Sequence, residues 1–460
     1  MTPPDGRAGT RLHVVIVGAG FAGVAAARAL ARCDVEVLLL DRRNHHIFQP
    51  LLYQVATAVL APGDVATPIR AIAATQPNLT VAMAEVTAID LAAHTLSAAL
   101  PDGRTRTIGF DYLVVATGVL PSYYGHDEFA AHAPALKTLG DAEAIRGKIL
   151  GAYERAELSD DPVERARLMT FVLVGAGPTG VELAASIAQM ARVTLKRDFR
   201  RLHPDQTRVI LLEGGARVLP TFDPKLAAAA GRQLARLGVE VRTGAIAQNV
   251  DADGVVVAGE RIRAATVLWT AGVAASPLAA QAGASADRAG RAQVGLNLET
   301  QQGSGVFVVG DAASLAQDGK PVPGVAQAAL QQGAYVGRAI ARRVRGGAAE
   351  PAFRYFNKGS MAVVGKDFAI LESPAMKMSG RLTWLVWALV HIATLPRLQN
   401  QLRVNVQWLW SYFTGQRGSR LIAEPVSAPP PRPAKPVAQA DSPGVDPGRR
   451  PKAAIAGRKA

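Results

Sequence analysis

The chain has 460 residues, of which 49% are hydrophobic and 5% aromatic, and its formal net charge is +14. This length and apolar content allow about two or three cores and predict a globular protein. Cys33 is the only cysteine, which excludes an intramolecular disulfide, a CxxC redox pair and a cysteine-ligated iron–sulfur cluster. Any electrons that the chain transfers therefore have to travel on organic cofactors.

The first ten residues lack the basic, long apolar and small-residue regions of a secretory signal peptide. No stretch of the chain reaches the roughly 18 continuous apolar residues expected of a membrane-spanning helix. The sequence therefore predicts a cytoplasmic protein, and any membrane contact that it makes is expected to be peripheral.

Residues 11–41 read as a strand, a glycine turn, a helix and a second strand, which together form a βαβ unit. In such a turn the first glycine permits a tight bend, the second lets the backbone approach a pyrophosphate, and the third lets the helix pack on the strand. An acid at the end of the second strand can accept hydrogen bonds from ribose hydroxyls. These residues are Gly18, Gly20, Gly23 and Asp41, and their order predicts a dinucleotide site rather than a structural loop.

Residues 169–213 repeat this order, with Gly175, Gly177 and Gly180 in the turn and Glu213 at the end of the second strand. Two such units in one chain indicate two nucleotides. An acid at this place favours a ribose 2′-hydroxyl and repels a 2′-phosphate, so the sequence predicts NADH over NADPH. Arg217 is close enough in sequence to leave that preference open.

The other segments suggest that the second unit is inserted into the first domain. Short strands at 76–115 and a polar helical stretch at about 140–157 precede the second unit, whereas strands at 266–273 and 306–313 and a helix at 326–344 follow it. The predicted fold class is α/β, with two Rossmann-type dinucleotide-binding domains and a C-terminal amphipathic helical region that anchors the chain to a membrane. The predicted boundaries are 11–160 and 290–350 for the first domain, 161–289 for the inserted domain, and 351–424 for the membrane-associating region.

The segment 308–312 has the sequence Val-Val-Gly-Asp-Ala. A helix that starts after such a strand would donate backbone N–H groups, and Asp311 would accept hydroxyl protons, as a second contact to the ribityl and pyrophosphate groups of a flavin requires. The alternative is an aspartate that only caps a helix, and the segment by itself favours this alternative.

Together these motifs resemble a known family. The two glycine turns, Ala-Thr-Gly at 116–118, Gly-Asp at 310–311 and, above all, Ala-Gln-Ala-Ala-Leu-Gln at 326–331 resemble the type II NADH:quinone oxidoreductases. In that family the AQxAxQ pattern is associated with the quinone pocket. Residues 45–57 and 357–366 also resemble family segments, and the resemblance covers about residues 11–422.

The resemblance implies a non-proton-pumping respiratory NADH:quinone oxidoreductase, a monotopic flavoprotein in which NADH reduces FAD and the reduced flavin reduces a membrane quinone. No metal site is expected, because neither chemical step needs one. The positions that would hold FAD are Gly18, Gly20, Gly23, Asp41, Gly118 and Asp311. The positions that would hold NADH are Gly175, Gly177, Gly180 and Glu213. Gln327 and Gln331 would flank the flavin and the quinone.

Two further residues are candidates for the chemistry. Glu182 lies two residues after the last glycine of the second turn, and the resemblance links this position to catalysis. We hypothesise that it positions the nicotinamide or relays a proton; the alternative is an acid that the helix dipole favours. Lys366 would place a cation near the quinone or the flavin, and the alternative is a solvated surface charge.

The region 382–413 has the pattern expected of a membrane-surface helix pair. Residues 382–395 are apolar with two tryptophans but are too short to cross a bilayer, and a second segment places Leu402, Val406, Leu409 and Phe413 at helical spacing. Six Lys or Arg and no acid occur between Lys377 and Arg420, a charge pattern that suits an anionic lipid surface. The alternative is a pair of core or dimer helices, and a homodimer is one partner that the sequence allows.

The last segment, 425–460, is rich in Pro, Ala, Lys and Arg and is predicted to be a disordered basic tail. The expected location of the protein is the cytoplasmic face of the inner (plasma) membrane. Two other functions stay open: an NADH-dependent reductase of a ferredoxin or rubredoxin, and an NADH-sensing binder that resembles apoptosis-inducing factor and uses its positive charge on nucleic acid. Nucleic acid is not the expected partner, and a sulfide:quinone or disulfide reductase would need more cysteines.

Overall fold

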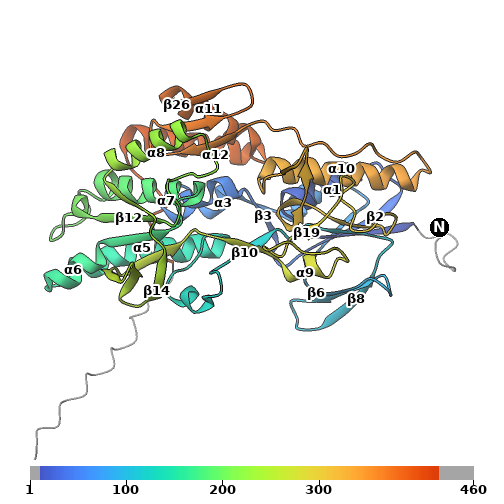
Figure 1. Cartoon of the computed structure of the whole chain (residues 1–460), viewed down its shortest axis with the longest axis horizontal. Coiled ribbons are helices and arrows are strands. Elements are labelled where there is room, and N and C mark those ends of the chain that lie inside the picture. The colour runs from blue at the N-terminus through green and yellow to red at the C-terminus, as the bar shows by residue number, and fades with distance from the viewer. Residues whose placement is uncertain (1–10, 424–460) are drawn as a thin grey trace, which may run out of the picture. The chain divides into compact units, whose positions relative to one another are not determined.

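The structure is a computed structural model, and it describes residues 11–423. The segment predicted to be a disordered tail, 425–460, lies outside the described residues. Two parallel sheets form the framework, and helices flank both (Figure 1), so the predicted α/β class is confirmed.

The first sheet has five parallel strands in the order β20-β9-β1-β2-β5. The first glycine turn joins β1 to helix α1, which leads to β2. Because β20 follows the second βαβ unit in sequence, the chain returns to its first sheet after that unit. The elements are β1 (Leu12–Val17), α1 (Phe21–Ala29), β2 (Val35–Asp41), β5 (Leu79–Met83), β9 (Tyr112–Val115) and β20 (Val306–Val308).

The second sheet has four parallel strands in the order β13-β12-β11-β17. Every residue of β11 is buried, and its sequence is apolar from Phe171 to Val174, as expected of a strand covered on both faces. The second glycine turn joins β11 to α7, and a π-helical turn follows α7 at Met190–Thr194. The elements are β11 (Thr170–Val174), α7 (Pro178–Gln189), β12 (Arg208–Glu213), α8 (Pro224–Arg236), β13 (Val239–Thr243) and β17 (Thr266–Trp269).

Two short strands connect the units, since β10 (Val119–Pro121) pairs antiparallel with β18 (Val273–Ala275). Helix α5 (Leu139–Leu158) begins at a capping box, in which Thr138 Oγ1 accepts a hydrogen bond from Asp141 N and the Asp141 carboxylate accepts one from Thr138 N. The buried residues of α5 share one core with those of α7 and β11. This helix therefore packs on the second sheet, although it precedes the second unit in sequence.

The remaining elements before α10 are small. Antiparallel sheets are formed by β6 (Glu85–Asp90), β7 (Thr95–Ala99) and β8 (Thr105–Gly109), and by β14 (Ala247–Asp251), β15 (Gly254–Val257) and β16 (Glu260–Arg263). The segment after β2 forms β3 (His45–Ile47), η1 (Gln49–Leu51), α2 (Leu52–Ala56), α3 (Pro62–Val65), β4 (Ala66–Pro68) and α4 (Ile69–Ala73). The others are η2 (Asp127–Ala131), α6 (Pro162–Leu168), η4 (Pro204–Gln206), α9 (Pro277–Ala280), β19 (Ala292–Gln293), β21 (Ala313–Ser314), β22 (Ala316–Gln317) and β23 (Lys320–Pro321).

Helix α10 (Ala326–Val344) packs against α1 at very short range (Figure 1). A Cβ on Gly333 would overlap the carbonyl oxygen of Ala22, and a Cβ on Gly337 would come within 2.6 Å of the Ala26 carbonyl oxygen. The two glycines therefore allow the helices to touch through their backbones. Cys33 is buried in the turn after α1 and not on a helix, and burial raises the pKa of its thiol.

The C-terminal part of the described chain is a small antiparallel sheet followed by two helices. The elements are β24 (Ser360–Val363), β25 (Ala369–Glu372), β26 (Lys377–Gly380), α11 (Arg381–Thr394) and α12 (Leu398–Thr414). Figure 1 shows them in orange and red beside α7 and α8. Within residues 11–423, the helices are all too short or too polar to span a bilayer.

The outer faces of α11 and α12 are apolar. Their inner faces bury Thr383 and Trp387 on α11 and Asn400 and Val404 on α12. Eight of the exposed apolar residues recur at helical spacing, and we call these eight the apolar stripe: Leu382, Leu385 and Leu389 on α11, and Leu402, Val406, Leu409, Trp410 and Phe413 on α12.

The structure corrects the expected basic character of this region. Arg417 is buried and points into the protein instead of toward a lipid surface. Three others form ion pairs with the protein itself: Lys377 with Asp223, Arg381 with Asp367, and Arg420 with Asp198. Of the six cations, only Arg397 and Arg403 are both exposed and without an ion pair within the part of the chain that the structure describes.

Candidate active site

The first glycine turn has the geometry that its sequence predicted. Gly18 has a φ of +101°, and a Cβ there would overlap the backbone of Ala116. A Cβ on Gly23 would overlap the Gly18 carbonyl oxygen, so only glycine lets α1 start this close to β1. Gly20 caps α1, and a Cβ there would meet open space, which is where a bound pyrophosphate would approach the backbone.

Asp41 closes this turn from the end of β2. Its Oδ2 accepts a hydrogen bond from Ala19 N at 2.7 Å, and its Oδ1 accepts one from Arg43 N at 2.8 Å. A carboxylate has about four acceptor positions, so two remain for ribose hydroxyls. The buried His46 donates from Nδ1 to the Ala19 carbonyl oxygen at 2.8 Å, and burial lowers the pKa of its imidazole, which keeps the ring neutral.

The second glycine turn repeats this arrangement. Gly175 has a φ of +104°, and a Cβ on Gly180 would overlap the Gly175 carbonyl oxygen. Glu213 accepts hydrogen bonds from Ala176 N and from Gly215 N, both at 2.8 Å. Gly177 caps α7, and a Cβ there would again meet open space. Each turn therefore has a helix N-terminus and a strand-end carboxylate that suit one dinucleotide.

Among the described residues, Arg217 forms no ion pair with the Glu213 carboxylate. Its guanidinium donates to the Pro220 carbonyl oxygen at 3.0 Å, three residues further along the chain. The carboxylate thus keeps its negative charge uncompensated by this arginine, which favours a 2′-hydroxyl over a 2′-phosphate. The arginine would have to leave Pro220 before it could accommodate a phosphate.

Thr117, Gly118 and Asp311 lie around the first turn, and one of them has a polar atom without a protein partner. The Thr117 hydroxyl oxygen is buried without a hydrogen-bond partner, and Gly118 follows it with a φ of +66°. Asp311 lies beside Gly324, and its carboxylate faces the half-buried Lys137, whose pKa is lowered by burial. Buried polar groups are normally paired, so the Thr117 hydroxyl is available to a polar ligand along the first sheet.

The backbone at Asp311 differs from the expectation. The sequence predicted the start of a helix here, but residues Gly310–Ala312 form one 3₁₀ turn, and the long helix α10 begins only at Ala326. Gln332 on α10 accepts a hydrogen bond from Gly310 N at 2.6 Å. This hydrogen bond from α10, and not a helix that starts at Gly310, therefore holds the turn in place.

Gln327 and Gln331 bind the backbone of a neighbouring segment. The Gln327 side chain accepts from Lys358 N and donates to the Gly359 carbonyl oxygen, at 3.0 and 2.7 Å. The Gln331 side chain accepts from Phe356 N and donates to its carbonyl oxygen, at 2.9 and 3.0 Å. Both amides thus hold segment 356–359 against α10, and their expected position beside flavin and quinone stays a prediction.

Lys366 lies at the C-terminal helices. Its ammonium donates to the Tyr412 carbonyl oxygen at 2.7 Å and lies 3.8 Å from the centre of the Tyr412 ring, a cation–π contact. These contacts tie the loop after β24 to α12. The structure shows Lys366 in contact with Tyr412. Its predicted role near a quinone stays a prediction.

Glu182 is the carboxylate that the fold perturbs most clearly. It lies in the first turns of α7, and its Oε1 accepts a hydrogen bond from Val363 N of β24 at 3.4 Å. Burial raises the pKa of Glu182 to about 8. Near neutral pH the carboxyl group therefore holds a proton that it can donate or exchange, which is the property of a general acid.

The sequence reading missed several residues beside Glu182. Tyr53 and Gln54 on α2 and Arg417 after α12 are buried, and Trp408 on α12 donates a hydrogen bond to Gln54. Two signals pointed to Tyr53 and Gln54: the polar pair Tyr-Gln inside the apolar run of residues 51–56, and the resemblance of residues 45–57 to a family segment. Nothing local connected that pair to residues of α12.

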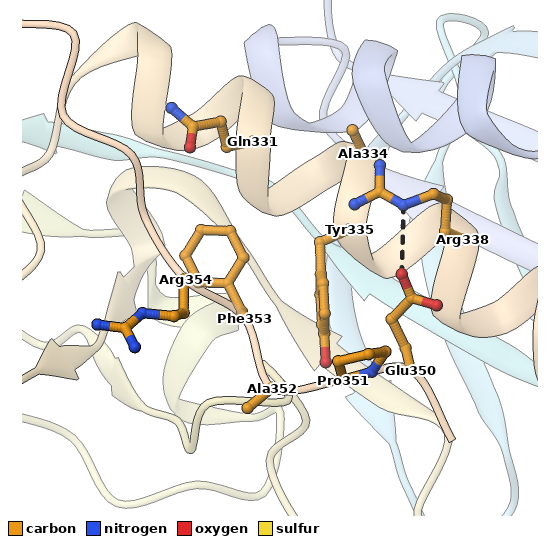
Figure 2. Close-up of a pocket in the computed structure, with 9 residues that line it drawn as sticks. All are labelled: Gln331, Ala334, Tyr335, Arg338, Glu350, Pro351, Ala352, Phe353 and Arg354. Atoms are coloured by element: carbon orange, nitrogen blue, oxygen red, sulfur yellow. Dashed lines mark hydrogen bonds and ion pairs between the residues drawn. The ribbon is translucent and has the colours of Figure 1, made fainter. Parts of the chain in front are cut away.

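Two open depressions of the surface lie away from the glycine turns. One has a volume of about 320 Å³ and lies between α10 and segment 350–354 (Figure 2). Tyr335 and Phe353 form its wall, and Arg338 pairs with Glu350 at its edge, at 3.3 Å. Gln331 is the only residue of the predicted site among those that line it, so this depression does not define the site.

Comparisons with known proteins are consistent with this geometry. Residues 12–333 match the family model described as pyridine nucleotide-disulphide oxidoreductase, and residues 357–417 match the model of the NDH2 C-terminal domain. The single buried cysteine separates this chain from the disulphide chemistry in the first name. The second match covers the antiparallel sheet and the two C-terminal helices.

Two relatives from Mycobacterium tuberculosis, the type II NADH:quinone oxidoreductases Ndh and NdhA, are 42% and 43% identical to this chain. The first alignment covers 92% of both chains and the second 90% of both. Among solved structures, NDH2 from Plasmodium falciparum in complex with NADH has a TM-score of 0.81 at 17% identity and covers 88% of this chain and 99% of that chain. That likeness supports the fold.

Proposed function

The chain belongs to the type II NADH:quinone oxidoreductase family, and we propose that its two glycine turns hold FAD and NADH for electron transfer to a quinone. The protein is an NADH dehydrogenase with FAD and NADH as cofactors and works in respiratory electron transport. The observation that carries the assignment of residues is the repeated turn, in which a strand-end carboxylate accepts hydrogen bonds at the glycine loop.

The first turn fits FAD. Gly18, Gly20 and Gly23 leave room for the pyrophosphate, and the free acceptor positions of Asp41 suit the adenosine ribose. The unpaired hydroxyl of Thr117, the turn at Gly118 and the Asp311 carboxylate would contact the flavin half. When bound, FAD accepts a hydride from NADH and passes two electrons to the quinone.

The second turn fits NADH, held by Gly175, Gly177, Gly180 and Glu213. Glu182 follows on the same helix, so an NADH molecule bound at this N-terminus would lie near its carboxyl group. We propose that Glu182 exchanges the proton that quinone reduction consumes. Gln327 and Gln331 would act by holding segment 356–359 in place, and Lys366 by holding α12.

Oxidation of NADH, followed by absorbance, tests this function with a soluble quinone analogue. We expect fast turnover that requires the quinone and prefers NADH over NADPH. The controls omit the acceptor or replace the nucleotide. If NADH reduces the flavin but the quinone does not reoxidise it, the acceptor is a small redox protein such as a ferredoxin or rubredoxin. Slow oxidation with salt-sensitive DNA binding would instead support the NADH-sensing alternative.

We further propose that α11 and α12 dock on a lipid surface through the apolar stripe. The side chains of Leu389, Leu402 and Phe413 are 68%, 60% and 79% exposed, and an exposed apolar face of this extent marks an interaction surface. The flanking Trp410 suits the interfacial layer of a membrane. Because four of the six nearby cations are ion-paired or buried within the protein, the binding energy is expected to come mainly from apolar burial.

Sedimentation with vesicles tests the lipid contact. We expect the protein to sediment with anionic vesicles and, to a lesser degree, with neutral ones. Replacement of Leu402 and Phe413 by Ser removes two exposed side chains and is expected to weaken sedimentation at least tenfold, since each buried side chain contributes about 1.5 kcal/mol or more. If the variant instead becomes monomeric while the parent protein is a dimer, the stripe is a homodimer interface.

The proposed division of the chain follows the sheets. Residues 11–160 and 290–350 form the FAD-binding domain, 161–289 the NADH-binding domain, and 351–424 the membrane-associating region. Its support is that β20 pairs with β9 of the first sheet, whereas β11 to β17 form the second sheet. Helix α5 bridges the division, because it packs on the second sheet. We propose that the enzyme binds the cytoplasmic face of the inner (plasma) membrane, where NADH is available.

A further inference from the structure

The loop after β10 holds a tyrosine in an unfavourable backbone conformation. Tyr124 has a φ of +55°, in the left-handed region that bulky side chains rarely adopt. The residue is also 70% exposed, so burial of its ring does not compensate for the strain. Strained residues of this kind persist where the surrounding structure fixes them, and they cluster at ligand sites.

The residues before Tyr124 fix this loop on the second sheet. Trp269, the last residue of β17, donates from Nε1 to the Ser122 carbonyl oxygen at 2.9 Å. The centre of its ring lies 5.0 Å from that of the buried Tyr123, whose hydroxyl donates to the Ala133 carbonyl oxygen at 2.9 Å. Because both preceding residues are anchored, the backbone of Tyr124 cannot relax without loss of these contacts.

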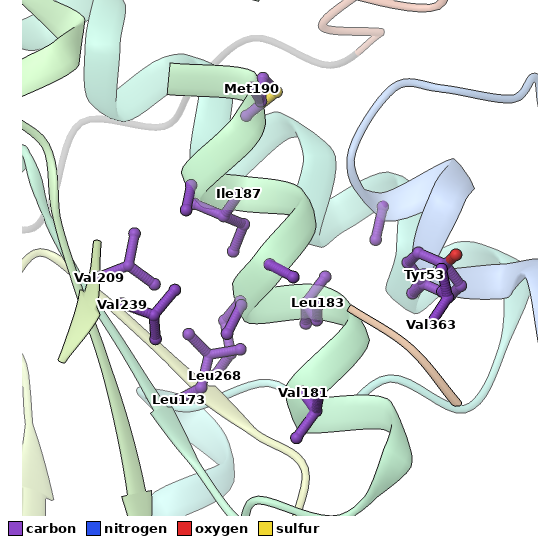
Figure 3. Close-up of a cluster of buried hydrophobic side chains, with 14 of the residues drawn as sticks. Tyr53, Leu173, Val181, Leu183, Ile187, Met190, Val209, Val239, Leu268 and Val363 are labelled. Carbon is purple, nitrogen blue, oxygen red and sulfur yellow. The ribbon is translucent and has the colours of Figure 1, made fainter. Parts of the chain in front are cut away.

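These anchors lie on the face of the second sheet that α7 does not cover. Figure 3 shows Leu173 and Leu268 among the buried side chains beside α7. Successive residues of a strand point to opposite faces, and Val174 and Trp269, which follow these two, belong to the cluster on the other face. The loop of Tyr124 therefore meets the carboxyl end of the sheet from the side opposite α7.

The Tyr124 ring packs on the backbone that follows β17. A Cβ on Gly272 would lie 2.7 and 2.8 Å from two atoms of the ring, so a side chain there would displace it. The residue before, Ala271, packs on the second glycine turn, since a Cβ on Gly175 would lie 2.7 Å from its backbone nitrogen. Thr270 Oγ1 also donates to the Gly175 carbonyl oxygen at 2.7 Å. The segment 270–272 thus connects the tyrosine ring with the second turn.

The strand order indicates which half of NADH would lie near Tyr124. In the second sheet, β11 lies between β12 and β17. Glu213 at the end of β12 suits the adenosine ribose, and the glycine turn at the end of β11 suits the pyrophosphate. A dinucleotide that continues in the same direction places its nicotinamide half beyond the end of β17, where the ring of Tyr124 lies.

We propose that Tyr124 is a binding residue for NADH, whose exposed ring packs against the nicotinamide half of the nucleotide. This inference rests on the proposed binding of NADH at the second turn. The anchors of the loop hold the ring in place before the nucleotide arrives, so little conformational freedom is lost on binding. Contact between the two flat rings removes apolar surface of both from water.

Binding of NAD⁺ and of ADP-ribose to the FAD-loaded enzyme, measured by calorimetry, tests this contact. NAD⁺ is used because NADH would reduce the flavin, and ADP-ribose lacks only the nicotinamide. Tyr124→Ala is expected to weaken NAD⁺ binding about three- to tenfold, as for the loss of an aromatic contact, and to leave ADP-ribose binding unchanged. Tyr124→Phe keeps the ring and should bind both ligands like the parent enzyme. Leu158→Ala, at an exposed position on α5, is the control for loss of a surface side chain.

Tyr124→Gly separates the ring from the backbone strain, because glycine adopts a positive φ freely. It should bind NAD⁺ as weakly as Tyr124→Ala but resist a higher concentration of denaturant. If Tyr124→Gly binds NAD⁺ like the parent enzyme, the backbone and not the ring explains the loss, and the inference fails. Equal weakening of NAD⁺ and ADP-ribose in Tyr124→Ala would also overturn it, since the effect would then not belong to the nicotinamide half.

Gly180→Ala separates the inference from the proposed function. If this variant binds both ligands like the parent enzyme, the nucleotide does not use the second turn, and the proposed site fails together with the inference. If Gly180→Ala weakens both ligands while Tyr124→Ala weakens neither, the proposed site stands and the contact with Tyr124 is refuted.

Discussion

The two glycine turns have nearly the same backbone but different surroundings. Their first glycines have φ values of +101° and +104°, and each third glycine packs on the carbonyl of the first. Around the first turn the neighbours are small: α1 meets α10 at Gly333 and Gly337, without room for a side chain. Around the second turn α7 carries a carboxyl group, Glu182, that meets β24 of the C-terminal region.

This difference suits the two nucleotides. The close backbone contact of α1 with α10 leaves no room for a side chain behind the first turn, which suits a flavin that stays bound through every cycle. In the second turn the Ala176 carbonyl oxygen accepts a hydrogen bond from Leu219 N. In the first turn the corresponding carbonyl oxygen, of Ala19, accepts one from the His46 side chain. Helix α7, which follows the second turn, carries the ionisable Glu182 where it contacts the C-terminal region. An ionisable group here suits a site at which NADH exchanges and protons move.

The largest effect is expected from removal of the third glycine in one turn at a time. Gly23→Ala would force a methyl group into the Gly18 carbonyl and is expected to lower the FAD content of the purified protein by about tenfold or more, with loss of stability. Gly180→Ala should keep FAD and raise the KM for NADH instead. Gly147→Ala, whose methyl group meets open space on α5, controls for the substitution. Equal loss of flavin in both turn variants would refute the separate roles.

Glu182→Gln should have the next largest effect, about a hundredfold on quinone reduction, as for a lost general acid. Because the carboxyl pKa is about 8, activity of the parent enzyme should fall above pH 8, whereas the variant should show no such midpoint. Stability should also fall as the pH rises, because the unfolded chain loses the Glu182 proton at a lower pH than the folded chain. The free energy of unfolding should therefore decrease between about pH 5 and 8 and level off above pH 8. A parallel pH profile in both proteins would contradict the assignment.

Replacement of either strand-end acid by Ala should have an effect of about tenfold, on nucleotide preference for Glu213 and on flavin retention for Asp41. Glu213→Ala removes the charge that repels a 2′-phosphate, so the ratio of kcat/KM for NADPH to that for NADH should rise, while the flavin content stays the same. Asp41→Ala should weaken FAD retention on dilution and leave the nucleotide preference unchanged. Steady-state kinetics and flavin absorbance check both, and a changed preference in Asp41→Ala would show that the sites are coupled.

The smallest effect concerns Cys33, which is buried beside the first turn's helix. Cys33→Ala is expected to leave NADH:quinone turnover unchanged, because no thiol takes part in the electron path. A small cavity should lower the unfolding free energy by about 1 kcal/mol, measured by denaturant titration. Loss of turnover with flavin retained would mean that the chain shares thiol chemistry with the disulphide reductases.

Much of the fold could be predicted because its signals are local. The buried strand β11 is apolar from Phe171 to Val174, and α10 was expected at the residues where it occurs, since a helix shows its apolar period within its own sequence. The Asp311 turn was not predicted, because its backbone is fixed by Gln332 from α10 and not by its own residues. The burial of Arg417 was missed for the same reason: its partners, Thr57 and Ser186, are 360 and 231 positions away.

The sequence by itself determined the parts that need a residue type at a short spacing. Two features were sufficient to predict two nucleotide sites: turns that only glycine fits, and an acid at the end of the strand that follows each turn. The motif at 326–331 added the resemblance to the family. Only the tertiary structure decided which groups surround Glu182, where Lys366 binds and that Trp408 reaches Gln54, 354 positions away. Burial and hydrogen-bond partners arise from packing between distant segments, and a local pattern contains no information about which segments meet.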